Sequence, residues 1–174
     1  SKMINVPKTK LLFFDIETVG IEEDFKTLKK NRPELAKLFE TYKGWIVKRF
    51  PEEENSTIDE MFYNKSALIP EFAKIIVASF AFYTPKGEIH TQTFSSDEEV
   101  DVLTEIKGLL NKVSKLDFYL CGHNIKNFDI PMIGKRMLIN GIKPPSLLPQ
   151  YDTKPWDIKA VDTMELWKFG NNYS

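Results

Sequence analysis

The stretch that decides the fold runs from Lys10 to Thr18 and reads Lys-Leu-Leu-Phe-Phe-Asp-Ile-Glu-Thr. Four large apolar residues followed at once by carboxylates are typical of a buried central strand that ends at a functional site. Because side chains alternate between the two faces of a strand, Asp15 and Glu17 are expected on one face and Ile16 on the other, in the core. The sequence therefore predicts two neighbouring carboxylates at the end of a buried strand.

Two carboxylates this close repel one another and lose hydration beside a core. A hard divalent cation such as Mg²⁺ or Mn²⁺ relieves both costs at once. The alternative is that Asp15 caps a turn and Glu17 is simply solvated. The apolar run before the pair and the Thr-Val-Gly sequence after it favour the metal-binding interpretation.

Patterns in the rest of the chain predict a mixed sheet flanked by helices, of the α/β class. The expected strands cover residues 10–14, 75–83, 88–94, 118–122 and 158–164. Residues 21–70 carry blocks of charge and helically spaced apolar residues, and they predict a helical insertion after the first strand. The charge blocks are expected to form a solvated face, and docking of a protein partner there is left open. Pro85-Lys86-Gly87 predicts a hairpin turn between two of these strands. Ser96 and Glu99 match a capping box at the start of one helix, and Asp129 opens another. One face of the first of these helices is expected to consist of Val100, Leu103, Ile106, Leu110 and Val113.

Length and composition limit the alternatives. The 174 residues (20.2 kDa) are 42% hydrophobic and carry a net charge of −1, which suits one domain over residues 1–174 with its own core and excludes intrinsic disorder as the main state. The near-zero net charge does not point to nucleic acid, although a basic surface can be local. The single Cys121 excludes an intramolecular disulfide and a four-cysteine zinc site. With no apolar run of 18 residues and no secretory signal, we expect a cytoplasmic protein that does not span a membrane.

A second constellation spans residues 122–131 and reads Gly-His-Asn-Ile-Lys-Asn-Phe-Asp-Ile-Pro. It follows an expected strand and opens an expected helix, so Asp129 lies at a helix N-terminus, where the helix dipole favours an anion. Alone, Asp129 would be interpreted as a helix cap and Phe128 as a core residue. The two segments together say more than either one does alone.

Phe-Asp-Ile-Glu-Thr at 14–18, followed by His-Asn-Ile-Lys-Asn-Phe-Asp at 123–129, resembles the first two signature motifs of the DEDD 3′→5′ exonuclease superfamily. The similarity is greatest to the proofreading exonuclease domain of family-B DNA polymerases and to the stand-alone PolB-like predicted 3′-5′ exonucleases. The order of the expected elements extends the resemblance from about residue 10 to 166. It implies a ribonuclease-H-like fold with a mixed five-stranded sheet.

The resemblance also implies hydrolysis of phosphodiester bonds with two divalent cations, Mg²⁺ or Mn²⁺, about 4 Å apart. It implies that Asp15 bridges the two cations. Glu17 would bind the cation that activates water, and Asp129 would serve the other one.

The same resemblance implies a substrate, which is the 3′ end of single-stranded nucleic acid, with DNA favoured over RNA. The backbone from Ile16 to Thr18 would meet the terminal nucleotide. Asn124 and Phe128 are expected to contact the last nucleotides, because an aromatic face stacks on any base.

The chain departs from the superfamily in its third motif, a Tyr or His followed by Asp on a later helix. After Asp162 only Glu165 provides an acid before the sequence ends at Ser174, and Tyr151 has Pro155 four residues later. We expect a domain truncated at its C-terminus that lacks the last helices and is weak or inactive. The alternatives are a module that binds nucleic acid without cutting it and a nuclease of the same fold that cuts internally. Asp162 itself is expected to cap a helix rather than to bind metal.

Overall fold

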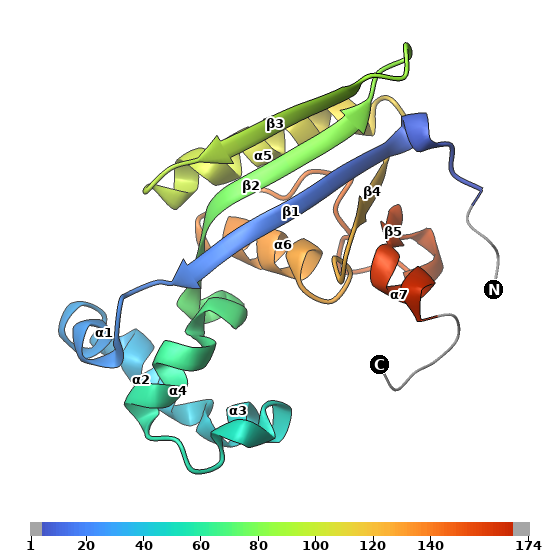
Figure 1. Cartoon of the computed structure of the whole chain (residues 1–174). Coiled ribbons are helices and arrows are strands. Elements are labelled where there is room, and N and C mark those ends of the chain that lie inside the picture. Colours follow the sequence, from blue (N-terminus) through green and yellow to red (C-terminus); the bar gives the residue numbers. More distant parts are fainter. Residues whose placement is uncertain (1–4, 169–174) are drawn as a thin grey trace. The chain divides into compact units, whose positions relative to one another are not determined.

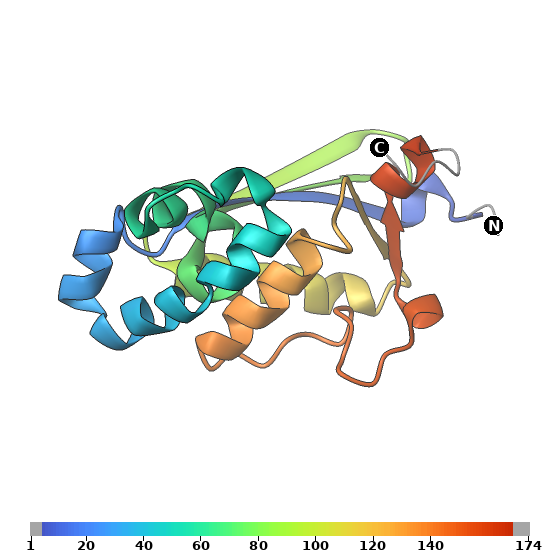
Figure 2. The ribbon, with the colours of Figure 1, turned by 90° about the horizontal axis from the view of Figure 1, so that it is seen from below.

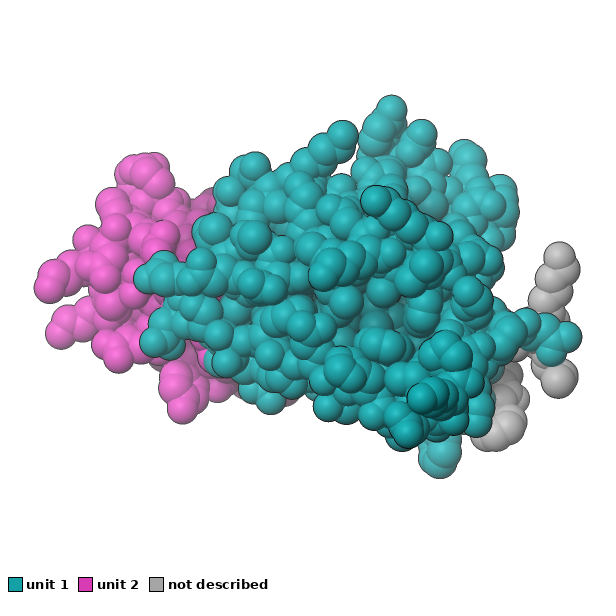
Figure 3. All heavy atoms as spheres, turned by 90° about the horizontal axis from the view of Figure 1, so that it is seen from above, with its two compact units in different colours: residues 1–17, 75–174 teal, residues 18–74 magenta. Residues whose placement is uncertain are grey.

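The structure is a computed structural model that describes residues 5–168. Its contacts divide the chain into two compact units (Figure 3). Unit 1 comprises the described residues up to Glu17 together with those from Ile75 onward, and unit 2 comprises Thr18–Lys74. Residues 169–174, on which the expectation of a C-terminal truncation partly depends, lie outside the described residues.

Unit 1 contains most of the sheet, and unit 2 contains four helices of the insertion. The five strands are β1 (Leu11–Gly20), β2 (Ala73–Tyr83), β3 (Ile89–Ser95), β4 (Tyr119–Gly122) and β5 (Ala160–Asp162). The α-helices of the described part are α1 (Phe25–Asn31), α2 (Pro33–Thr41), α3 (Lys43–Arg49), α4 (Ile58–Lys65), α5 (Glu99–Ser114), α6 (Asp129–Ile139) and α7 (Thr163–Trp167). Short 3-10 helices occupy Lys8–Lys10, Pro51–Glu53, Ser66–Leu68, Pro70–Phe72 and Pro155–Asp157. Within residues 5–168, none of these helices combines the length and apolar character needed to cross a membrane.

The sheet is mixed, as the sequence predicts, with the strand order β3-β2-β1-β4-β5. Strands β2 and β3 pair antiparallel, and β1 pairs in parallel with β4, which pairs in parallel with β5. In Figure 1, β1 and β2 run in opposite directions. Because β1, β4 and β5 are parallel, their C-terminal ends point toward the same edge of the sheet. Three features lie toward that edge: Asp15, the loop that follows Gly122, and Asp162 at the end of β5.

Helices α5 and α6 lie on the same side of the sheet in both ribbon views (Figures 1 and 2). Strand β1 contributes the buried side chains of Leu12, Phe14 and Ile16 to the core. Of the predicted apolar face of α5, Leu103, Ile106, Leu110 and Val113 are buried. Val100 was wrongly included, because it is 48% exposed and Val102 is buried instead. The buried faces of β1 and α5 thus belong to the core on this side of the sheet.

Three details differ from the sequence-based expectations. The first strand does not end before the carboxylates, because β1 continues to Gly20, so Asp15 and Glu17 lie inside it. The predicted capping box at Ser96 and Glu99 is wrong, because α5 begins after Glu98, and Ser96 Oγ accepts the Glu98 N–H and donates to Asp101 instead. The predicted last strand ends early at Asp162. The Asp162 carboxylate accepts the N–H of Met164 and thereby starts α7, where an extended chain was expected.

Unit 2 is the helical insertion that the sequence predicts. Its helices enclose an aromatic core in which Phe39 contacts Phe62 and Phe72 edge-to-face, with ring centroids 5.1 and 4.9 Å apart. Phe25 adds a third tilted ring against Phe39 at 5.9 Å. Such edge-to-face pairs add to the stabilisation that burial alone provides. The insertion therefore has a hydrophobic core of its own.

Candidate active site

Strand β1 separates its carboxylates from its core residues as the alternation predicts. Asp15 and Glu17 are exposed, whereas Ile16 between them is only 6% exposed. The two carboxylates therefore leave the same face of the strand. The strand thus presents two acids to solvent while its other face anchors it in the core.

Asp129 lies at the first position of α6 and is 4% exposed. Its Oδ2 accepts a hydrogen bond from the backbone N–H of Ile16 at 3.2 Å. This contact joins residues 113 positions apart and places Asp129 directly beside the Asp15–Glu17 segment. The two motifs of the sequence thus meet at one place in unit 1.

The environment of Asp129 penalises its charge. The pKa of this carboxyl is raised from 3.8 to about 6, mainly by burial and to a smaller extent by the negative charges of Asp15 and Asp162, while the hydrogen bond from the Ile16 N–H opposes the rise. A carboxylate that is desolvated beside another carboxylate is the electrostatic condition that a bound cation relieves.

The loop between β4 and α6 has little freedom. A Cβ on Gly122 would lie 2.7 Å from the carbonyl oxygen of Phe14 and 2.5 Å from Cγ2 of Ile125, so only glycine fits where β4 passes β1. Asn124 has φ +56°, in the left-handed region that asparagine tolerates better than most residues. Close packing and this turn lead the chain from β4 into α6.

Asp162 holds this loop from the end of β5. It is 2% exposed, and its carboxylate accepts the N–H groups of Asn124 (2.8 Å), Lys126 (3.1 Å) and Met164 (3.0 Å). The prediction that Asp162 caps a helix is confirmed, and the structure adds that the same carboxylate fixes the loop before Asp129. Glu165 forms an ion pair with Lys126 at 3.1 Å, at the surface of that loop.

The residues expected to contact substrate lie in both units. Asn124 and Phe128 are half-buried in the loop before α6, and the N–H of Phe128 donates to the Asn124 carbonyl at 3.1 Å. The hydroxyl of Thr18 donates to the carbonyl of Ala67 at 2.7 Å within unit 2. Ile16 contributes its N–H to Asp129, so that group is already engaged.

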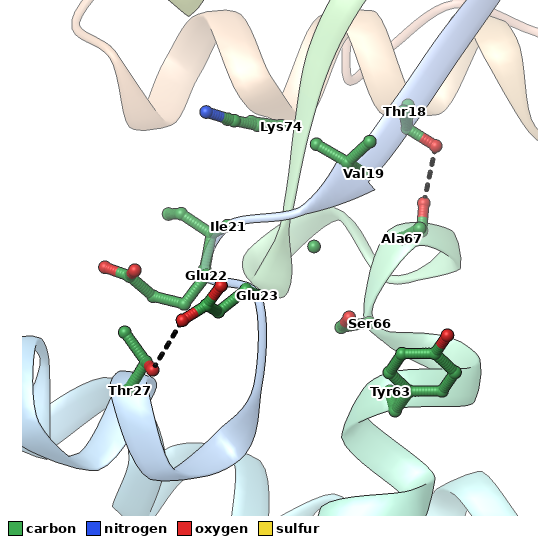
Figure 4. A pocket seen from close by; sticks show the side chains of 11 residues that line it. Thr18, Val19, Ile21, Glu22, Glu23, Thr27, Tyr63, Ser66, Ala67 and Lys74 are labelled. Atoms are coloured by element: carbon green, nitrogen blue, oxygen red, sulfur yellow. Dashed lines mark hydrogen bonds between the residues drawn. The ribbon is translucent and has the colours of Figure 1, made fainter.

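Unit 2 contains a pocket of about 640 Å³ that Thr18 helps to line (Figure 4). Tyr63, Lys74 and Glu23 also line it, and Thr27 donates to Glu23 at 3.4 Å on its wall. A volume of this order is typical of small-ligand sites. Its first lining residue along the chain, Thr18, directly follows Glu17.

The candidate ligands suit a hard cation by chemistry, because all three predicted ligands offer carboxylate oxygens. The structure brings Asp129 to the backbone beside Asp15, and Glu17 leaves the same strand face as Asp15. Across residues 5–168, however, no three His, Cys, Asp or Glu side chains are grouped closely enough to hold a metal ion. Cys121, buried in β4, contributes no thiolate, since burial raises its pKa to about 11.

One cluster escaped the sequence analysis. Glu99 and Arg136 form a buried ion pair between α5 and α6, with N–O distances down to 2.7 Å. The only signal for it in the sequence was an acid and a base on the expected helices, and Glu99 was assigned to a capping box instead. Long-range pairs of this kind depend on tertiary packing, so spacing along the chain does not reveal them.

Comparison with known protein families identifies the class. A model of the family "DNA polymerase family B, exonuclease domain" matches residues 1–158. The chain belongs to this family, and its fold is that of an exonuclease domain. No curated protein sequence matches the chain.

Among solved structures, the chain is similar to the family B DNA polymerase from the hyperthermophilic archaeon Pyrobaculum calidifontis. The TM-score is 0.50 at 14% identity, over 93% of this chain and 16% of the polymerase. It is also similar to E. coli exonuclease I, solved in complex with a dT13 oligonucleotide, with a TM-score of 0.41 at 10% identity over 91% of this chain and 29% of that enzyme. The chain thus spans a small part of each of these proteins, and the likeness to the polymerase concerns the fold.

Proposed function

We propose that the chain is a metal-dependent 3′→5′ exonuclease domain that removes nucleotides from the 3′ end of single-stranded nucleic acid. DNA is favoured over RNA because the family is a domain of DNA polymerases. The observation that best supports the proposal is the hydrogen bond from Ile16 N–H to Asp129 Oδ2, which joins the two acidic motifs in one place. Neither motif would carry the proposal alone.

Asp15, Glu17 and Asp129 would hold two Mg²⁺ or Mn²⁺ ions, which supply water activation and neutralise charge on a phosphodiester. The chain's own groups prepare these ligands. The Ile16 N–H fixes the Asp129 carboxylate, and Asp162 fixes the loop that leads to it. A preset carboxylate spends no free energy on reorganisation when the substrate arrives.

The residues proposed to contact the substrate lie close to these carboxylates in the sequence. Phe128 lies half-buried one residue before Asp129, and its ring can stack on a base without regard to sequence. Asn124 has an amide in the same loop that can donate to a phosphate or a base. From the resemblance alone, we also propose that the backbone at Ile16 and Thr18 meets the terminal nucleotide.

The sequence lacks a recognisable third motif, so we expect the chain to be weak or inactive as a nuclease. An incomplete set of ligands lowers both cation affinity and the precision of alignment. The alternative function is a module of the same fold that binds nucleic acid without cleaving it. Cation binding must therefore be measured together with cleavage.

The test uses a 5′-labelled single-stranded DNA, a copy with a blocked 3′ end and a circular single strand, each with Mg²⁺ or Mn²⁺. We expect slow shortening of the linear strand from its 3′ end, with the blocked and circular strands left intact. Asp15→Ala and Asp129→Ala are expected to lower Mn²⁺ affinity and cleavage at least tenfold. Asp97→Ala, an exposed acid outside the site, is the matched control and should leave both unchanged.

Other outcomes decide against the proposal. Cleavage of the circle identifies an internally cutting nuclease. Salt-dependent DNA binding without any cleavage, together with a Mn²⁺ affinity that Asp15→Ala leaves unchanged, identifies the binding module. Equal cation affinity in the wild type and in Asp129→Ala removes Asp129 from the site.

A further inference from the structure

A buried ion pair lies at the far end of α6 from Asp129. Arg136 on α6 and Glu99 at the start of α5 are 3% and 9% exposed. Arg136 donates from Nη2 to Glu99 Oε1 at 2.7 Å and from Nε to both oxygens, at 3.1 and 3.0 Å. Asn140 donates to Oε1 at 2.9 Å, and the backbone N–H of Ile75 donates to Oε2 at 2.7 Å. One carboxylate thus ties together α5, α6 and the start of β2.

Stability alone does not account for this cluster. Removing two charges from water costs about as much as their attraction returns, and apolar residues of similar volume are often as good or better. A guanidinium that donates to a carboxylate through more than one N–H differs from apolar packing in one respect: it accepts a single orientation. Apolar side chains would let α6 slide or rotate slightly along its groove.

The position of the cluster on α6 is informative. Arg136 follows Asp129 by seven residues, which is about two helical turns, or roughly 10 Å along the axis. Both side chains are on the buried face of the helix. The helix is therefore fixed at one end by Glu99 and presents Asp129 at the other end, where the Asp129 carboxylate accepts the N–H of Ile16.

We propose that Glu99, Arg136 and Asn140 are positioning residues that set the depth and rotation of α6, so that the Asp129 carboxylate meets β1 at Ile16. The inference rests on the proposed function, since it gives Asp129 its importance. A displacement of about 1 Å would take the 3.2 Å contact between Asp129 and Ile16 outside hydrogen-bonding range. Misplacement of that size in a catalytic group lowers rates by about a hundredfold.

The test replaces the ion pair by uncharged side chains of similar size. In the double variant Glu99→Gln, Arg136→Met, the glutamine oxygen still accepts the N–H of Ile75, while the orienting ion pair is gone. Lys135→Met is the matched control, because it removes a cation from the exposed side of the same helix. The main readout is amide hydrogen exchange at Ile16, which reports the contact to Asp129 directly and needs neither cation nor substrate.

We expect the double variant to fold and the exchange of the Ile16 amide to accelerate at least tenfold, while that of the Leu12 amide stays unchanged. Mn²⁺ affinity should fall by about tenfold, and Lys135→Met should behave as the wild type. A folded double variant with unchanged Ile16 exchange and unchanged Mn²⁺ affinity overturns the proposal.

Arg136→Lys covers the case in which the double variant does not fold, because it keeps the charge and loses the planar fork. It should accelerate Ile16 exchange severalfold, and no change at Ile16 would overturn the proposal equally. Failure of the proposed function is a separate result. If Asp129→Ala cleaves DNA normally, Asp129 is not a catalytic ligand, while the Ile16 amide still decides whether the cluster positions α6.

Discussion

Replacing Asp129 by asparagine is expected to stabilise the cation-free protein at neutral pH. Asparagine has the shape of the protonated acid, and its Oδ1 can still accept the Ile16 N–H that Asp129 now accepts at 3.2 Å. It carries no charge to be desolvated beside Asp15. The substitution therefore removes a cost and keeps a hydrogen bond.

The magnitude follows from the pKa of Asp129, which burial raises from 3.8 to about 6. Between these two values the folded state binds more protons than the unfolded state, so the free energy of unfolding falls as the pH rises through this window. Each unit of difference corresponds to about 1.4 kcal/mol, so the ionised carboxylate costs about 3 kcal/mol above pH 6. Asp129→Asn should be more stable by up to that amount at pH 7.5 and no more stable than the wild type at pH 3.5.

The measurement is urea unfolding of both proteins with EDTA at several pH values, with Asp97→Asn as a control at an exposed acid. Addition of Mn²⁺ should narrow the difference in the free energy of unfolding at pH 7.5, because only the wild type offers the cation a charged carboxylate at position 129. A lower stability of Asp129→Asn at pH 7.5, or a difference that does not change with pH, would refute the electrostatic reasoning.

Three other substitutions test packing and helix capping within the individual units. Gly122→Ala should lower the free energy of unfolding by about 1 to 3 kcal/mol, as overpacking does, because its Cβ would lie 2.7 Å from the Phe14 carbonyl oxygen. If urea unfolding shows no change in stability, the close packing of β4 on β1 is contradicted. Thr57→Ala should cost about 1 kcal/mol, since it breaks the capping box with Glu60 at the start of α4, and Thr57→Ser should restore stability in the same unfolding assay. Phe39→Ala should cost roughly 3 to 5 kcal/mol by emptying the aromatic core of unit 2, with Phe39→Leu milder, and thermal unfolding with similar values for both variants would count against that core.

Much of the fold follows from local patterns. The apolar run that becomes β1, the Pro-Lys-Gly turn between β2 and β3 and the apolar stripe of α5 are each legible within a short window. The insertion is also recognisable as helical, because its apolar spacing persists through Leu35, Leu38 and Tyr42. The sequence-based predictions are wrong at the ends of elements, where a single side chain determines the residue at which a strand or helix stops or starts. Asp162 captures the N–H of Met164 and turns an expected strand into α7.

The site was predicted in part. The separation of Asp15 and Glu17 from Ile16 needs only the alternation of a strand, and the sequence contains it. The contact of Asp129 with Ile16 spans 113 positions, and only the similarity to a known family pointed to it before the structure. The roles of the three carboxylates as ligands stay a prediction.

The sequence by itself determined which residues are acidic, which segments are strands and that two acidic motifs occur in a fixed order, because those properties depend on neighbours a few positions away. Only the tertiary structure decided that Asp129 is buried with a raised pKa, that Asp162 serves the loop and the helix at once, and that Glu99 pairs with Arg136. Burial and pairing arise when distant segments pack together. The physical reason is that desolvation and hydrogen-bond geometry depend on distances in space, and spacing along the chain does not fix those distances.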